Sequence, residues 1–207
     1  FPSFSRLQDH PQELKKAIER TLFFITFVTF PILGGLTILS PLIVQIIPKY
    51  SKWEPALLAL ALYCFNSAWA SVSTPLTNTL NALGKVKINT FLMIMWTVLT
   101  WILIPPLASR YGYNGVAIAT AIIAVSSLVP IAIVKHLTHF SLLNSVLKPF
   151  VATLVMMVIS YLLLPVNVTL NIVLSAITFM FVIYLLVGKS LITDSQKILY
   201  ALVGKKA

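Results

Sequence analysis

The amino-acid sequence predicts an all-α protein that crosses a membrane several times, and both its composition and its uncharged runs predict this class. Hydrophobic residues make up 58% of the 207 residues and charged residues only 10%, whereas soluble domains carry roughly 25% charged residues. Uncharged runs recur along the chain. A membrane-spanning helix needs about 20 residues, and each run is at least that long. We therefore expect a polytopic membrane protein with no soluble domain.

The uncharged runs predict six transmembrane helices. The runs cover residues 21–48, 55–84, 88–109, 111–134 and 149–188. The last run is long enough for two helices, and Pro165 and Asn167 supply a turn signal within it. The expected helices are 21–47, 55–83, 88–108, 115–134, 147–164 and 169–187.

The two ends of the chain are expected to lie outside the membrane core. Residues 1–20 combine basic and apolar positions and predict an amphipathic surface segment that leads into the first helix. Residues 189–207 form a basic tail, in which helical spacing of apolar residues favours an interfacial helix. A frayed polar end is the alternative for this tail.

Lysine and arginine lie mostly on one side of the predicted helices. The chain ends and the loops after the second and fourth helices hold 12 of the 15 basic residues; Lys49, Lys52 and Arg110 lie on the other side. By the positive-inside rule both ends are expected in the cytoplasm, and an even number of helices also requires them to share a side. The net charge of +10 thus reflects topology and does not indicate binding to nucleic acid.

The groups that catalysis or ion coupling needs are absent from the predicted helices. All carboxylates fall in flanks or loops of this prediction: Asp9, Glu13, Glu19, Glu54 and Asp194. An ionisable group at membrane depth is the usual sign of coupling, and none is expected here. His136 and His139 could share a helix face, but no further ligand is near them in the sequence, so we expect no metal and no cofactor. No catalytic residue is predicted, because no acid or base stands beside a buried nucleophile.

The second predicted helix is unusually rich in amide and hydroxyl side chains. The candidates for a polar face are Asn66, Ser67, Ser73, Thr74, Thr77, Asn78 and Asn81. Spacings of three and four residues place such side chains on one broad helix face. Two interpretations remain open. The face either packs closely against another helix with hydrogen bonds across the interface, or lines a cavity in which neutral donors and acceptors bind a polyhydroxylated ligand.

Prolines and glycines interrupt the first two predicted helices. Pro75 lies in the middle of the polar helix, where it removes a backbone donor and favours a bend. Pro31 acts in a similar way in the first helix, and Gly34 and Gly35 weaken that helix through their greater backbone freedom. These four residues are candidates for hinges between rocking bundles, with ordinary close packing in lipid as the alternative.

Several sequence phrases, in this order, resemble those of a known family. The first 47 residues carry Pro2, Ser5-Arg6-Leu7, Pro31 and Gly35-Leu36. The phrases "KWEPALLALA", "NTLNALGKVKINTFLMI" and "RYGYNGVAIATAI" follow at 52–61, 78–94 and 110–122. Over about residues 1–134 this order and spacing resembles polysaccharide and lipid-linked oligosaccharide flippases of the multidrug/oligosaccharidyl-lipid/polysaccharide exporter superfamily.

This resemblance implies a particular architecture and function. Such proteins have two six-helix bundles around a central cavity, often with two extra helices. The chain would then be the C-terminal part of a 12–14-helix transporter, with 21–134 completing the second bundle and 135–188 adding two helices. The implied activity is alternating-access flipping of a polyprenyl-diphosphate-linked oligosaccharide across the cytoplasmic membrane. The implied partners are the bilayer, the glycan lipid and the missing N-terminal bundle.

The resemblance leaves some roles and rival functions open. Lys85 and Lys87 are local candidates for contact with the diphosphate or with lipid headgroups, and anchoring by the positive-inside rule is their alternative role. A multidrug or metabolite exporter of the same fold remains a rival. A membrane-embedded glycan-processing enzyme would need acidic catalytic residues and usually a sizeable loop, and the sequence offers candidates for neither, so we expect a transporter and not an enzyme.

Overall fold

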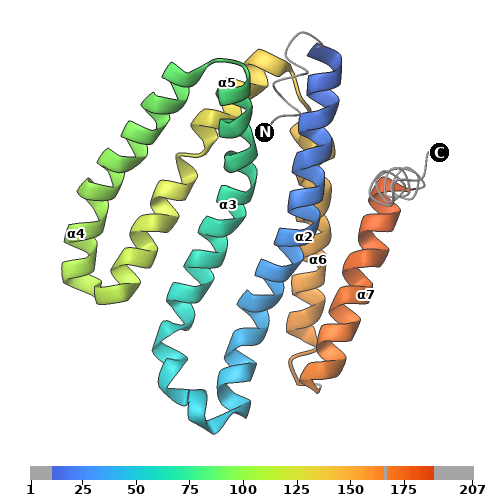
Figure 1. The fold of residues 1–207 in the computed structure, drawn as a ribbon. Coiled ribbons are helices and arrows are strands. Elements are labelled where there is room, and N and C mark those ends of the chain that lie inside the picture. The colour runs from blue at the N-terminus through green and yellow to red at the C-terminus, as the bar shows by residue number, and fades with distance from the viewer. Residues whose placement is uncertain (1–10, 166, 189–207) are drawn as a thin grey trace, which may run out of the picture.

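The structure, a computed structural model, describes residues 11–165 and 167–188, and in this part the chain is helical with short connections and no strand (Figure 1). The α-helices are α2 (Pro11–Ile46), α3 (Leu57–Ala82), α4 (Val86–Val125), α5 (Leu128–Thr138), α6 (Lys148–Leu162) and α7 (Val168–Val187). A 3₁₀-helix, η1 (Pro48–Ala56), joins α2 to α3, and a π-helix, η2 (Leu143–Leu147), precedes α6. The predicted all-α, multi-pass class is confirmed.

Five helical stretches in the described part of the chain are long and apolar enough to cross a membrane. The third, Val86–Thr138, has 53 residues and reverses direction within α4, so Figure 1 shows two antiparallel arms. The reversal occurs at Gly112, whose φ of 58° and ψ of −138° are favourable only for glycine. Counted as two arms, this stretch accounts for the six expected helices.

The two arms of α4 approach each other closely beside this reversal. A Cβ atom added at Gly115 would overlap the backbone carbonyl of Leu107. Only a residue without a side chain therefore fits at the start of the second arm. This contact, together with Gly112, fixes the hairpin that separates the third expected helix from the fourth.

The first helix begins earlier than the uncharged run indicated. In α2 the helix already includes residues 11–20, and Leu14, Ile18 and Leu22 are buried in the core. Glu19, expected ahead of the helix, lies inside it, and its carboxylate accepts a 2.7 Å hydrogen bond from the backbone N–H of Ser141. The apolar side of this basic segment therefore packs against protein. The expected tail segment, residues 189–207, lies outside the described residues.

The fourth expected helix is divided between α4 and α5. Pro130 has no N–H to donate to the carbonyl of Ser126, which instead accepts from Val129. The Ser126 hydroxyl accepts a 2.9 Å hydrogen bond from Trp96 Nε1 on the first arm of α4. The break is thus tied to the neighbouring arm by a polar contact.

The helix bundle has two chemically different ends. One end holds the start of α2, the α3–α4 connection and the α5–α6 connection (Figure 1), and we call it the basic end. Among the described residues this end carries seven lysines and arginines, including the exposed Lys85, Lys87 and Lys135, whereas the opposite end carries three: Lys49, Lys52 and Arg110. The opposite end holds η1, the reversal at Gly112 and the α6–α7 turn. This division matches the side assignment expected from the charge count.

Helices α6 and α7 form a pair that packs on α2. Asn171 of α7 is fully buried, and its Nδ2 donates to the carbonyl of Ser160 on α6 over 2.9 Å. Its Oδ1 accepts from the hydroxyls of Ser160 and Ser175 at 2.8 and 3.0 Å. This satisfied polar cluster joins the two helices, a common use of amides in lipid. The α6–α7 turn falls where Pro165 and Asn167 predicted it, and the Asn167 side chain accepts from Thr169 N–H.

The neighbouring glycines of α2 have different surroundings. A Cβ at Gly34 would lie 2.9 Å from Cγ2 of Thr153 and 3.1 Å from Met157 on α6, whereas a Cβ at Gly35 would meet nothing within 4 Å. Gly34 therefore lies in a close contact between α2 and α6, whereas Gly35 does not. The structure provides a packing role for Gly34, and the hinge role remains a prediction.

We predict that Gly34→Leu destabilises the protein by about 1–3 kcal/mol, because the added atoms overpack the α2–α6 contact. Gly35→Leu is the matched control and should leave the stability unchanged or slightly raise it, since leucine favours helix more than glycine does. Thermal unfolding of the purified protein in detergent measures both variants. Equal losses at the two positions would show that the α2–α6 contact is not the cause.

Candidate functional site

An open groove of about 500 Å³ lies between α2 and α3, in the half of the hairpin nearer the basic end. Nine residues line it: Thr21, Ile25, Thr29, Ser67, Ala70, Ser71, Thr74, Pro75 and Asn78. Six of them carry a hydroxyl or an amide, and none carries a charge. The groove can therefore exchange hydrogen bonds with a neutral polar ligand, but it offers no group for acid–base chemistry.

Three predicted residues, Ser67, Thr74 and Asn78, line the groove, and all three are exposed. Spacings of seven and four residues place them on one stripe of α3. Ser71 completes the stripe, half-buried, with its hydroxyl donating to the carbonyl of Ala68 over 2.7 Å. These side chains form the polar wall that the cavity interpretation requires.

Other predicted residues lie away from the groove. Ser73 and Thr77 are buried, and the Thr77 hydroxyl donates to the carbonyl of Thr74 in its own helix over 2.9 Å. Asn66 is half-buried and does not line the groove. The structure therefore divides the predicted broad face into an open stripe and a packed one. The packing interpretation therefore applies to the buried part of the face, and the cavity interpretation of the open stripe remains a prediction.

Asn81 belongs to the packed part. Its Oδ1 accepts a 2.9 Å hydrogen bond from Nδ2 of Asn89 in the first turns of α4. Asn89 is buried, and this is the helix–helix hydrogen bond that small polar residues make in lipid. Asn81 thus holds α4 against α3.

We predict that Asn81→Leu destabilises the protein by about 1–3 kcal/mol, because the buried amide of Asn89 loses its acceptor. The double variant with Asn89→Leu should recover part of this loss, since replacing both partners removes the unpaired group. A double-mutant cycle of thermal unfolding measures the coupling. Strictly additive losses would argue against the hydrogen bond as the source of stability.

Pro75 adds a backbone feature to the groove. It lies inside α3, is buried and lines the groove beside Ser71. Proline has no N–H, so the carbonyl of Ser71 does not receive the usual helical donor from position 75. Pro31 lies inside α2, which continues through it; bending at either proline remains a prediction.

Lys85 and Lys87 lie at the α3–α4 connection and do not line the groove. Lys85 is the N-cap residue of α4, Lys87 lies in its first turn, and both are exposed. Gly84 precedes them with φ of 70°, which allows the tight turn between α3 and α4. Their position at the basic end fits an anchor at the headgroup layer.

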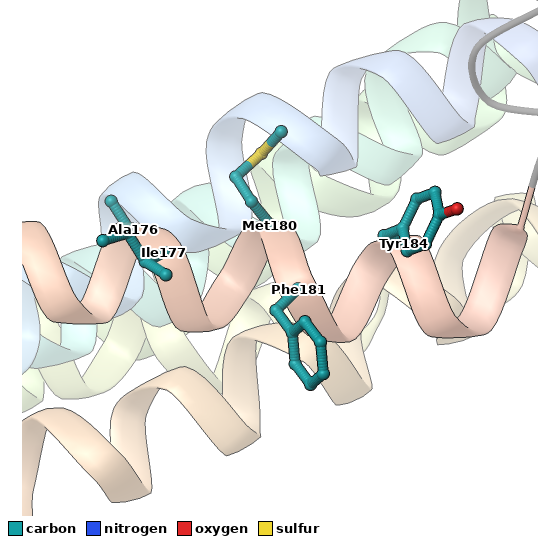
Figure 2. Close-up of a pocket in the computed structure, with 5 residues that line it drawn as sticks. All are labelled: Ala176, Ile177, Met180, Phe181 and Tyr184. Carbon is teal, nitrogen blue, oxygen red and sulfur yellow. The ribbon is translucent and has the colours of Figure 1, made fainter.

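A second hollow, of about 470 Å³, lies on α7 alone and differs in chemistry (Figure 2). Ala176, Ile177, Met180, Phe181 and Tyr184 line it, and the Tyr184 hydroxyl is the polar side-chain atom among them. Ile177, Met180 and Phe181 are exposed. Such a surface suits lipid chains, so the α2–α3 groove is the candidate site for a polar ligand.

The sequence alone missed the α2 side of the groove. Thr21 and Thr29 are eight residues apart, with Ile25 between them, and therefore lie on one face of α2. The Thr29 hydroxyl donates to the carbonyl of Ile25 over 2.8 Å. This threonine spacing is a weak signal, and only the packing of α2 against α3 gives it meaning.

These features define a multi-pass helical membrane protein with an uncharged polar groove between two of its helices. Comparisons with known proteins agree with this class. Residues 1–58 match a family described as "Polysaccharide biosynthesis protein". The chain is 27% identical over 168 residues to the lipopolysaccharide biosynthesis protein WzxC of Escherichia coli. It is 29% identical over 171 residues to an uncharacterized membrane protein in the cps region of Klebsiella pneumoniae.

The alignments with these relatives cover 78% and 77% of this chain, and the chain spans about a third of their length, 34% in each case. Among solved structures, the fold is similar to the lipid II flippase MurJ in an inward closed conformation, with a TM-score of 0.70 and 18% identity. That match covers 92% of this chain and 42% of the flippase. The resemblance seen in the sequence is confirmed: the chain is similar to polysaccharide and lipopolysaccharide biosynthesis proteins, and its fold is similar to part of a lipid II flippase.

Proposed function

We propose that this chain is part of a flippase that moves a polyprenyl-diphosphate-linked oligosaccharide across the cytoplasmic membrane by alternating access. The observation that carries the proposal is the α2–α3 groove, whose lining is neutral and rich in hydroxyls, whereas many of the exposed side chains in the described part of the helices are large and apolar. Sugar hydroxyls both donate and accept hydrogen bonds, as do the Asn, Ser and Thr side chains of the groove. The similarity to WzxC and the MurJ fold support the same function.

The groove would bind the glycan, and the diphosphate would bind elsewhere. A diphosphate is recognised by charge-assisted hydrogen bonds from arginine or lysine, and the nine lining residues include neither. The remaining part of the transporter, which we expect to be an N-terminal bundle, would supply those cations and the opposite cavity wall. In this proposal the protein acts as a transporter and performs no chemistry on the glycan.

The basic end would lie in the cytoplasm. Lys85, Lys87 and Lys135 are exposed there, and the positive-inside rule places such loops on the cytoplasmic side. At the opposite end Tyr50, Trp53, Tyr111, Tyr113 and Tyr161 are exposed. Aromatic side chains of this kind favour the headgroup interface. The groove would then open toward the leaflet in which the lipid-linked glycan is assembled.

Reconstitution tests this proposal directly. The full-length protein is placed in vesicles with a fluorescent polyprenyl-diphosphate oligosaccharide, and the fraction that reaches the opposite leaflet is measured with an impermeant quencher. We expect protein-dependent translocation of the glycan lipid. Transport of cationic drugs by the same vesicles, without movement of the glycan lipid, would favour the rival exporter function.

A further inference from the structure

The exposed face of the α2–α3 hairpin changes character along its length. On α3, Tyr63 lies four residues before Ser67, and Leu60 lies three residues before Tyr63. This is the spacing of the polar stripe, so both residues share its face. Leu60 is 37% exposed and Tyr63 41%. The stripe is therefore polar toward the basic end and largely apolar toward the opposite end.

Helix α2 shows the same change at the same level. Ile32 and Leu36 continue the spacing of Thr21, Ile25 and Thr29. They are 56% and 44% exposed. Together Ile32, Leu36, Leu60 and Tyr63 form an uncharged surface, which we call the apolar patch.

The apolar patch shares its orientation with the groove. A helix hairpin that turns its hydroxyl and amide stripe away from lipid also turns the rest of that face away, because both halves lie on the same side of α2 and α3. A lipid-facing surface is found instead on α7, whose exposed side chains from Leu170 to Leu186 are apolar apart from the Tyr184 hydroxyl. The apolar patch therefore needs an occupant other than lipid.

We infer that the apolar patch is the outer gate of the transporter, where this chain closes against an apolar helix face from the remaining part of the same protein. The chain corresponds to 42% of the structurally similar flippase, so such a fold includes further helices to provide that face. An uncharged constriction closes by excluding water and opens without breaking ion pairs. The gate would stay shut while the groove is open to the basic end and would open to water when the glycan leaves. This inference rests on the proposed function.

Spin-label accessibility tests the gate. In the full-length protein, with Cys64 replaced by Ala and any other native cysteine removed, nitroxides are attached to Leu36→Cys and Tyr63→Cys. The protein is reconstituted in vesicles, and collisions with oxygen, which partitions into lipid, and with a water-soluble nickel chelate are measured. Ile177→Cys on α7 and Thr74→Cys in the groove are the lipid and water references.

We expect the labels at 36 and 63 to be shielded from both reagents without substrate. Their contact with the nickel chelate should rise several-fold when glycan lipid is supplied and turnover begins. Oxygen contact as strong as at 177 in every condition would place the patch against lipid and overturn the inference. Shielding from both reagents in all conditions would make the patch a fixed interface and also overturn it. If instead the Thr74 label meets lipid, the groove and the proposed function fail together.

Discussion

Replacing Thr74 by Val and Asn78 by Leu should slow translocation of the glycan lipid by about tenfold or more. The two side chains are exposed in the groove, and each would lose one or more hydrogen bonds to sugar, at about 0.5–1.5 kcal/mol for each bond. A total near 1.4 kcal/mol corresponds to a factor of ten. Initial translocation rates in reconstituted vesicles measure the effect. Abundance and thermal stability should stay near those of the unchanged protein, because neither side chain is buried.

Thr77→Val is the matched control for the groove variant. It removes a threonine hydroxyl three residues further along α3, on the packed side, where the Thr77 hydroxyl donates to the carbonyl of Thr74. Its translocation rate should equal that of the unchanged protein. If Thr77→Val and the groove variant slow transport equally, the effect comes from the structure of α3 and the groove does not contact the glycan.

Gly115→Leu should destabilise the protein more than any other single substitution considered. Even its Cβ would overlap the carbonyl of Leu107 in the first arm of α4. Overpacking a core usually costs about 1–3 kcal/mol and occasionally more, and here the obstacle is backbone, which cannot move aside by changing a rotamer. We expect loss of folded protein in detergent, measured by size-exclusion profile and thermal unfolding.

Tyr113→Leu provides the comparison for this hairpin. Tyr113 lies in the same reversal but is exposed, so its replacement should change stability little. Normal folding of Gly115→Leu would show that the two arms of α4 are further apart than the structure indicates. Loss of folding in both variants would show that the turn tolerates no change at all, and would remove the specific role of Gly115.

The expected and observed helices agree where a strong local signal marks their ends. Pro165 and Asn167 favour a turn through their own backbone chemistry, and the turn occurs there. The boundary between the third and fourth expected helices follows from the charge at Arg110, and the structure reverses direction at Gly112, two residues further on. The expected first helix begins at residue 21, whereas α2 begins at Pro11. The charged residues before position 21 limit the uncharged run, but they do not interrupt the helix. Lys15 and Glu19 continue the helix beyond the apolar run, while Leu14 and Ile18 bury their side chains in the core.

The sequence by itself determined the class of this protein: apolar runs of sufficient length, separated by short basic connections, have few alternatives to a multi-pass helical bundle. It also located the polar side chains on α3. Only the tertiary structure decided which of them are buried in helix packing and which line the groove, because this depends on the neighbouring helix that each side chain meets. Thus Asn81 meets Asn89 on α4 and is held in the interface. Asn78, less than one turn away, is exposed and lines the open groove beside α2.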